Sequence, residues 1–208
     1  MKRPILILLL LIGFISTAQN KDFNQFSVDV NYGLSIPVAP ILENRNASDF
    51  IGYNAFSLGV RYMFNPKFGL RASYGNVKFQ DKNSKEDNLK FNNFNLQGYT
   101  NLTYLIGFNR DYSKDFNLLL HGGGGITLAK ASTAANNERI GNIIIGTTPL
   151  YKLADNFDLS ADISYTITLK QHFGYNGQLL NPDYKSQTGS YFNFTVGFIY
   201  YFGKNSAE

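Results

Sequence analysis

The sequence predicts an all-β fold in which eight antiparallel strands close into an up-and-down barrel. Apolar and polar residues alternate with a period of two in one segment after another, and no long window shows the spacing of an amphipathic helix. The polar connections between these segments alternate between long and short, which is typical of transmembrane barrels. An apolar run at the N-terminus adds an export signal.

That signal comes first along the chain. Lys2 and Arg3 form a basic start, residues 5–15 are almost entirely apolar, and Ser16–Thr17–Ala18 provides a small-residue cleavage site. We therefore predict a cleaved signal peptide over residues 1–18 and a barrel domain over residues 19–208. The chain has no cysteine, which excludes disulfides, thiolate metal sites and a lipid anchor on a cysteine.

The charge balance argues against nucleic acid as a partner. Removing Lys2 and Arg3 lowers the formal net charge from +4 to about +2. No basic stripe compensates for this small charge, and the length suits a single domain.

Eight segments carry the alternation. The predicted strands lie near 26–37, 55–65, 68–79, 91–107, 116–129, 140–153, 157–169 and 191–202. Their long connections are predicted at 39–54, 80–90, 130–139 and 170–189, and their short turns at 65–67, 108–115 and 154–156. An even number of strands returns both ends of the mature chain to the same side of the barrel.

Alternation alone does not say whether the apolar face points outward, so a soluble lipocalin-type barrel is the main structural alternative. Aromatic residues near the short-turn ends favour the membrane, since they form the girdle expected at a lipid–water interface. The strands also reach the ~9–11 residues that a tilted strand needs to cross hydrocarbon. The predicted girdle comprises Tyr62, Phe64, Phe68, Tyr104, Phe116, Phe157, Tyr200 and Phe202.

The opposite face carries charges that would be costly in a dry core, and a polar lumen accommodates them. We expect Arg61 and Arg71 to pair with Asp29, Asp158 or Asp162 and so to form a polar plug. A barrel of eight strands is just wide enough for its side chains to fill, so an open pore is not expected. A narrow gated conductance is the alternative.

The run His121–Gly125 has the letters of an oxyanion hole or a phosphate loop, but its context supports neither. Ile126 and Thr127 follow where a phosphate loop needs Lys and Ser or Thr, and no Gly-x-Ser-x-Gly elbow accompanies it. We interpret the glycines as strand residues, with Gly122 and Gly124 facing lipid and Gly123 and Gly125 facing the lumen. His121 is expected to be a hydrogen-bonded lumen residue.

The terminal segment 191–202, YFNFTVGFIYYF, ends in aromatic residues like the last strand of a bacterial outer-membrane barrel. With the export signal and eight strands, the chain resembles the small outer-membrane protein A/X-type barrels, the outer membrane protein beta-barrel domain family. The resemblance covers essentially the whole mature chain, although six residues follow Phe202. It implies an outer-membrane location with both mature termini periplasmic, outer-membrane lipid as the surroundings, and the barrel assembly machinery as a partner during biogenesis.

The expected function is non-enzymatic, and no cofactor or metal site is assigned. Exposed loops on a rigid scaffold often carry binding, so Phe50, Tyr53, Tyr175 and Tyr184 are candidate contacts for surface ligands or partners. The lipid-facing wall could instead dock the barrel into a larger outer-membrane complex as an accessory subunit. An outer-membrane lipid-modifying hydrolase is the alternative.

For that hydrolase, His172 would be the general base. Lipid A deacylases of this shape place a serine two residues after the histidine, where this chain has Gly174. The nucleophile–base pair is therefore missing from the sequence.

Overall fold

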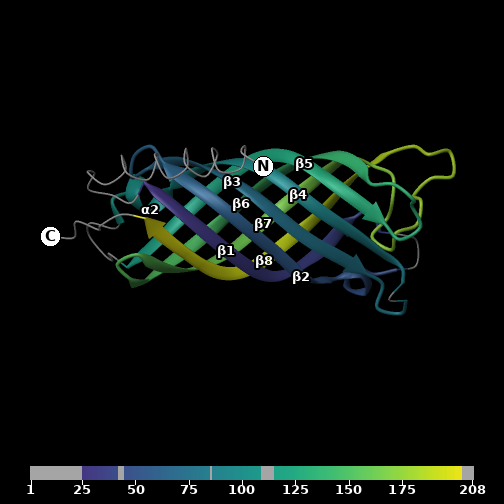
Figure 1. Cartoon of the computed structure of the whole chain (residues 1–208), viewed down its shortest axis with the longest axis horizontal. Helices are drawn as coiled ribbons and strands as arrows, with labels where there is room; N and C mark the ends of the chain where they lie inside the picture. Colours follow the sequence, from purple (N-terminus) through teal and green to yellow (C-terminus); the bar gives the residue numbers. More distant parts are fainter. Residues whose placement is uncertain (1–24, 42–44, 85, 109–114, 203–208) are drawn as a thin grey trace, which may run out of the picture.

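The computed structural model describes residues 25–41, 45–84, 86–108 and 115–202, and in this range the chain forms a closed barrel. Every strand is hydrogen-bonded to its sequence neighbours, and β8 returns to β1 (Figure 1). The predicted eight-stranded antiparallel up-and-down barrel is therefore confirmed. The predicted signal peptide, residues 1–18, and both mature termini lie outside the described residues.

The eight strands are joined by loops that contain two single-turn helical segments. In order, the elements are β1 (Phe26–Ala39), η2 (Ala47–Phe50), β2 (Gly52–Met63), β3 (Phe68–Gln80), β4 (Asn88–Asn101), α2 (Leu102–Leu105), β5 (Phe116–Ala131), β6 (Glu138–Ala154), β7 (Phe157–Gln171) and β8 (Gln187–Phe202). In the part of the chain that the structure describes, no helix has the length and hydropathy needed to cross a bilayer.

The two ends of the barrel differ. The loop end carries the connections 40–51, 81–87, 132–137 and 172–186, and the turn end carries 64–67, 102–115 and 155–156. The predicted strand 91–107 was too long, because β4 stops at Asn101. The Asn101 side chain accepts a hydrogen bond from the Tyr104 backbone N–H and so caps α2. The predicted short turn 108–115 therefore belongs to a longer connection, of which 109–114 lie outside the described residues.

The outward face is apolar over most of each strand. On β8, Phe192, Phe194, Val196 and Phe198 all point outward and are exposed, with Val196 reaching 64 %. Such a surface would be a large apolar patch on a soluble protein, whereas in lipid it is solvated. Six predicted girdle residues are exposed, namely Tyr62, Phe64, Phe68, Tyr104, Phe157 and Tyr200. Phe116 and Phe202 are half-buried.

The interior is layered along the barrel rather than polar throughout. At the turn end, Tyr99, Leu119, Leu150 and Ile199 form a small apolar cluster. Polar side chains fill the middle. At the loop end a larger apolar cluster takes over, which we call the cap; its buried residues are Phe50, Ala55, Val77, Phe79, Leu89, Phe91, Ala129, Ala131, Ile140, Tyr175 and Tyr191. The expectation of a polar plug therefore holds only for the middle layer.

The cap exists because the alternation changes phase within single strands. On β4, Phe94 and Leu96 face outward, but Leu89 and Phe91 of the same strand are fully buried inside. Successive strand residues point to opposite faces, so an apolar face that shifts from even to odd positions moves from the outside of the barrel to the inside. The strands thus continue beyond the apolar band as a barrel with an apolar core.

The glycine run on β5 is explained by a close approach to β4. A Cβ on Gly123 would overlap the carbonyl oxygen of Leu96, and one on Gly125 would overlap that of Phe94. Larger residues at these two positions would push the strands apart. The run is therefore part of the barrel wall.

Candidate functional site: the polar network in the lumen

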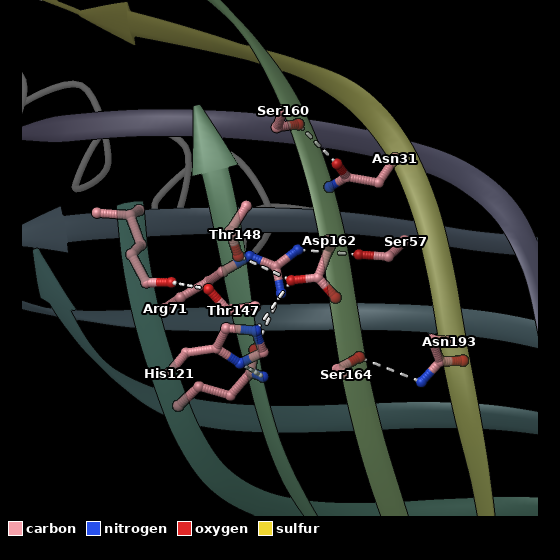
Figure 2. Close-up of polar contacts among 12 residues, drawn as sticks. Asn31, Ser57, Arg71, His121, Thr147, Thr148, Ser160, Asp162, Ser164 and Asn193 are labelled. Carbon is pink, nitrogen blue, oxygen red and sulfur yellow. Dashed lines mark hydrogen bonds and ion pairs between the residues drawn. The ribbon is translucent and has the colours of Figure 1, made fainter. Parts of the chain in front are cut away.

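An arginine–carboxylate pair lies at the centre of the lumen. Arg71 on β3 donates from Nε to Asp29 Oδ2 over 2.9 Å and from Nη2 to Asp29 Oδ1 over 2.5 Å. Nη1 donates to Gln97 Oε1 and Nη2 also reaches Ser57 Oγ, a contact visible in Figure 2. The pair is bidentate and buried, which is the geometry in which such an interaction is strongest.

Gln97 connects Arg71 to His121 by hydrogen bonds to both side chains. Because its Oε1 accepts from Arg71, its Nε2 amide faces His121 Nδ1, 3.1 Å away, and donates to it. The ring proton is then on Nε2, which donates to Asp162 Oδ2 over 2.9 Å. Thr148 Oγ1 donates to the same Asp162 oxygen. His121 is thus a hydrogen-bonded lumen residue, held in one tautomer.

Arg71 reaches Asp29 by crossing over a glycine. β3 carries Arg71 and β1 carries Asp29, while β2 lies between them. The guanidinium lies over Gly59 of β2, where a Cβ would overlap Nε. The absence of a side chain at Gly59 is therefore what allows this ion pair to form.

The same arrangement recurs on the other side of the lumen. His121 on β5 reaches Asp162 on β7 across Gly146 of β6, where a Cβ would lie 2.7 Å from His121 Nε2. Figure 2 shows both side chains converging inside the barrel.

A third bridge joins β1 to β7. Ser160 donates to Asn31 Oδ1 over 2.9 Å, and the two side chains meet over Gly197 of β8 (Figure 2). Asn31 and Ser160 are both register partners of Gly197. In each of the three bridges, a lumen-facing glycine lies beneath a polar contact between the strands on either side of it.

This geometry makes Gly59→Ala a specific test. We expect the added methyl to displace Arg71 and to lower the free energy of unfolding by about 1–3 kcal/mol, as overpacking does. The measurement is urea unfolding of the barrel in lipid vesicles. Gly98→Ala is the matched control, because a Cβ there meets only the Gly122 carbonyl oxygen, at 3.8 Å. If the two variants were equally stable, Arg71 would not need the space above Gly59 to reach Asp29.

Arg61 does not pair as the sequence predicted. It is 3 % exposed and forms no ion pair with Asp29, Asp158 or Asp162; instead its guanidinium lies 4.5 Å from the centre of the Tyr99 ring. Arg61 does not pair with Asp29 because Arg71 already donates hydrogen bonds to both carboxylate oxygens of Asp29. Asp158 accepts from the Tyr201 hydroxyl over 2.7 Å. Of the predicted ion pairs, the structure therefore contains Arg71–Asp29. The partners of Arg61, Asp158 and Asp162 are Tyr99, Tyr201 and His121, which the alternation of residues along a strand could not identify.

A cavity of about 80 Å³ runs beside this network. Arg61, Asn95 and His121 are among the side chains that line it, and Arg61 Nε has no hydrogen-bond partner among the described residues. A polar cavity of this size accommodates a few water molecules, which can satisfy the guanidinium. The apolar clusters at the two ends bound this polar middle layer.

The loop 172–186 folds over the mouth at the loop end and inserts Tyr175 into the cap. The Tyr175 ring lies 4.6 Å from that of Phe79, and its single hydroxyl hydrogen is shared between the carbonyl oxygens of Ser190, at 2.8 Å, and Ala39, at 3.1 Å. The prediction that Tyr175 and Phe50 are exposed loop contacts was wrong, since each is 2 % exposed. Of the four candidates, Tyr53 and Tyr184 are exposed, at 70 % and 56 %.

A charged cluster ties the connection 40–51 to the connection 81–87. Arg45 pairs with Asp81 at 2.7 Å and Lys82 pairs with Asp49 at 2.7 Å. Hydrogen bonds from the Lys82 side chain and the Asn46 backbone lower the pKa of Asp49 to about 2. The carboxylates of the cluster therefore stay charged at pH values above the ordinary carboxyl value of 3.8.

Neither histidine is placed to activate a nucleophile. The His121 ring bonds Gln97 and Asp162, and the His172 ring pairs with Glu138 and stacks on Tyr184. No hydroxyl of the described residues hydrogen-bonds to either ring. In the same range, no group of three or more His, Asp and Glu side chains is arranged to hold a metal ion. What the arrangement does is join strands that are not neighbours and fill the lumen.

Comparisons with known proteins agree with this architecture. A family model described as "Outer membrane protein beta-barrel domain" matches residues 5–205. Neisserial surface protein A is similar in structure, with a TM-score of 0.54 and 12 % identity over 84 % of this chain and 96 % of that one. No curated protein matches the sequence.

Two further solved structures are similar at lower scores. OprG from Pseudomonas aeruginosa has a TM-score of 0.49 and 11 % identity, over 86 % of this chain and 97 % of that one. Ail, the attachment invasion locus protein of Yersinia pestis, has 0.45 and 15 %, over 85 % and 99 %. At these identities the likeness concerns the fold.

Proposed function

Since the chain belongs to the outer membrane protein beta-barrel domain family, we propose that it is a non-enzymatic barrel that acts through its loop end or its outer wall, as a surface-binding or accessory protein of the outer membrane. The loop end is extracellular in this proposal, and the turn end and both mature termini are periplasmic. Long loops on the outside and short turns on the inside are the usual arrangement of such barrels. The turns 64–67 and 155–156 fit it, whereas the connection 102–115 is longer than the loops 81–87 and 132–137.

The observation that carries the proposal is the filled lumen. The Arg71–Asp29 bridge crosses its middle, and the cap with Tyr175 occupies its loop end. Passage of solutes would require the cap and the network to be displaced together. A rigid, filled barrel leaves its loops and its wall as the surfaces through which it can act.

Two features support a non-enzymatic role over the hydrolase. The nitrogen of His121 that accepts a proton is occupied by an amide, and no hydroxyl of the described residues hydrogen-bonds to the His172 ring, which pairs through Nδ1 with Glu138. General-base catalysis would require a hydroxyl within hydrogen-bond reach of one of these rings. Glycine occupies position 174, which the lipid-modifying alternative would need as serine.

Planar-bilayer recording tests the filled lumen. We expect the purified barrel to leave the current at baseline in concentrated KCl, while a porin added to the same bilayer opens steadily. Steady large openings from the barrel itself would contradict the proposal and would support the pore alternative.

Two assays test the rest of the proposal. Incubation with lipid A should release no fatty acid; release that disappears in His172→Ala would establish the hydrolase instead. A mild-detergent pull-down from native outer membranes should recover a stoichiometric partner. Repeating it with Tyr53→Ala/Tyr184→Ala distinguishes the two surfaces, since only binding through the loop end should be lost.

A further inference from the structure

The outer wall carries a row of basic residues just beyond its apolar band. On β3 the outward positions run Leu70, Ala72, Tyr74 and then change to polar side chains, and β4 changes in the same way. The first charged positions past this change are outward-facing on four consecutive strands. We call them the basic row: Lys78 on β3, Lys90 on β4, Lys130 on β5 and Arg139 on β6.

The sheet register makes these residues direct neighbours. Lys78 is the Cα partner of Lys90, and Lys90 is the Cα partner of Lys130. Arg139 pairs with Leu128, so it lies diagonally across from Lys130. Directly opposite side chains have Cβ atoms roughly 5 Å apart, and like charges at this spacing destabilise a sheet.

Within the described residues, no carboxylate neutralises the row. None of its four members forms an ion pair with a carboxylate in the described ranges, although other lysines and arginines near the loop end do. Lys130 Nζ donates to the backbone carbonyl oxygens of Ala134 and Ala135, and among the described residues no side chain accepts a hydrogen bond from Nζ of Lys78 or Lys90. Adjacent positive charges without a carboxylate partner, all on one outward face, are complementary to an anionic partner.

The position of the row indicates which anion that is. Between it and the apolar band lie Asn76 and Asn92. Asn92 Oδ1 accepts hydrogen bonds from Asn76 Nδ2 and from the Tyr74 hydroxyl, as polar groups at a lipid–water boundary do. The adjacent positions towards the turn end, Phe94 and Leu96, are 50 % and 58 % exposed and face lipid. The row therefore lies at the depth of lipid headgroups.

We propose that the basic row binds phosphate groups of lipid headgroups in the leaflet at the loop end. Lipid phosphates supply the negative charge that the register of β3, β4 and β5 lacks, and the apolar band below holds the acyl chains. β1 carries Ile36 and Val38 outward at this end, so the headgroup site lies on one side of the barrel.

Native mass spectrometry of the barrel released from neutral detergent micelles tests this site. The probes are phosphatidic acid and phosphatidylcholine with the same acyl chains. We expect the barrel to retain phosphatidic acid preferentially, and Lys78→Gln/Lys90→Gln to weaken that retention about 30-fold, since each lysine near an anionic surface contributes about fivefold. Lys78→Arg/Lys90→Arg should keep it.

The matched control is Lys67→Gln/Lys185→Gln, which removes two lysines from the turn 64–67 and the loop 172–186 and changes the net charge equally. It should bind like the wild type, and a heat-modifiability gel should show all variants folded. Three results would overturn the proposal: no preference for phosphatidic acid, an equal loss in the control, or displacement of the lipid by inorganic phosphate at equal concentration, which would identify a free-anion site.

Discussion

Replacing Asp29 by Asn is expected to destabilise the barrel by about 3–5 kcal/mol, because it leaves the Arg71 guanidinium buried without its counter-charge. The carboxylate accepts two hydrogen bonds from Arg71 and a third from Asn31. An asparagine side chain offers one oxygen in place of two and no charge. Urea unfolding in lipid vesicles measures the loss.

Asp155→Asn is the control for this experiment, since the Lys152–Asp155 pair is exposed on the Asp155 side and such pairs contribute about 0–1 kcal/mol. A double variant, Asp29→Leu/Arg71→Met, should recover much of the loss, because replacing both partners leaves no orphan charge. If Asp29→Asn costs no more than Asp155→Asn, the central bridge does not stabilise the lumen.

Tyr175→Ala is expected to destabilise the barrel by about 3–5 kcal/mol and to free the loop 172–186 from the mouth. The substitution empties a site among Phe79, Phe91 and Tyr191, and it removes the two hydrogen bonds from the hydroxyl. Urea unfolding measures the loss of stability, and limited proteolysis of the intact barrel should show faster cleavage within the loop.

Two other substitutions separate the contributions to this effect. Tyr175→Phe keeps the ring and should cost about 1 kcal/mol for the lost hydrogen bonds. Tyr184→Ala changes an exposed tyrosine of the same loop, so it should lower the free energy of unfolding much less than Tyr175→Ala does. If proteolysis of the loop were as slow in Tyr175→Ala as in the wild type, Tyr175 would not be what anchors the loop.

The strands were predictable because their signal is local. Alternation with a period of two located all eight, and the strands 157–169 and 191–202 begin or end at the residues where β7 and β8 do. The main error, the extension of β4 past Asn101, has a local cause as well. Apolar residues continue through Leu102 and Leu105, but they form α2, because the Asn101 side chain accepts a hydrogen bond at the N-terminus of that helix.

The site was only partly predictable, for a geometrical reason. Periodicity placed Asp29, Arg61, Arg71, Asp158 and Asp162 on the inward face. Which of them meet depends on the register of strands that are not neighbours and on the glycines between them. Lumen-facing glycines such as Gly59 and Gly146 could have indicated that a polar contact crosses above them, since each lies under such a contact. The residues that form the contact can be identified only once the register is known.

The sequence by itself determined the all-β class, the number of strands and the division of each strand into two alternating faces, because alternation is a property of consecutive residues. Tertiary structure decided the rest. Phe50 and Tyr175, which look like exposed loop aromatics in the sequence, are buried because the loops fold back over the mouth. Closure of β8 onto β1 brings distant strands within reach of one another, so the partners across the lumen are set by the closed barrel and by no local pattern.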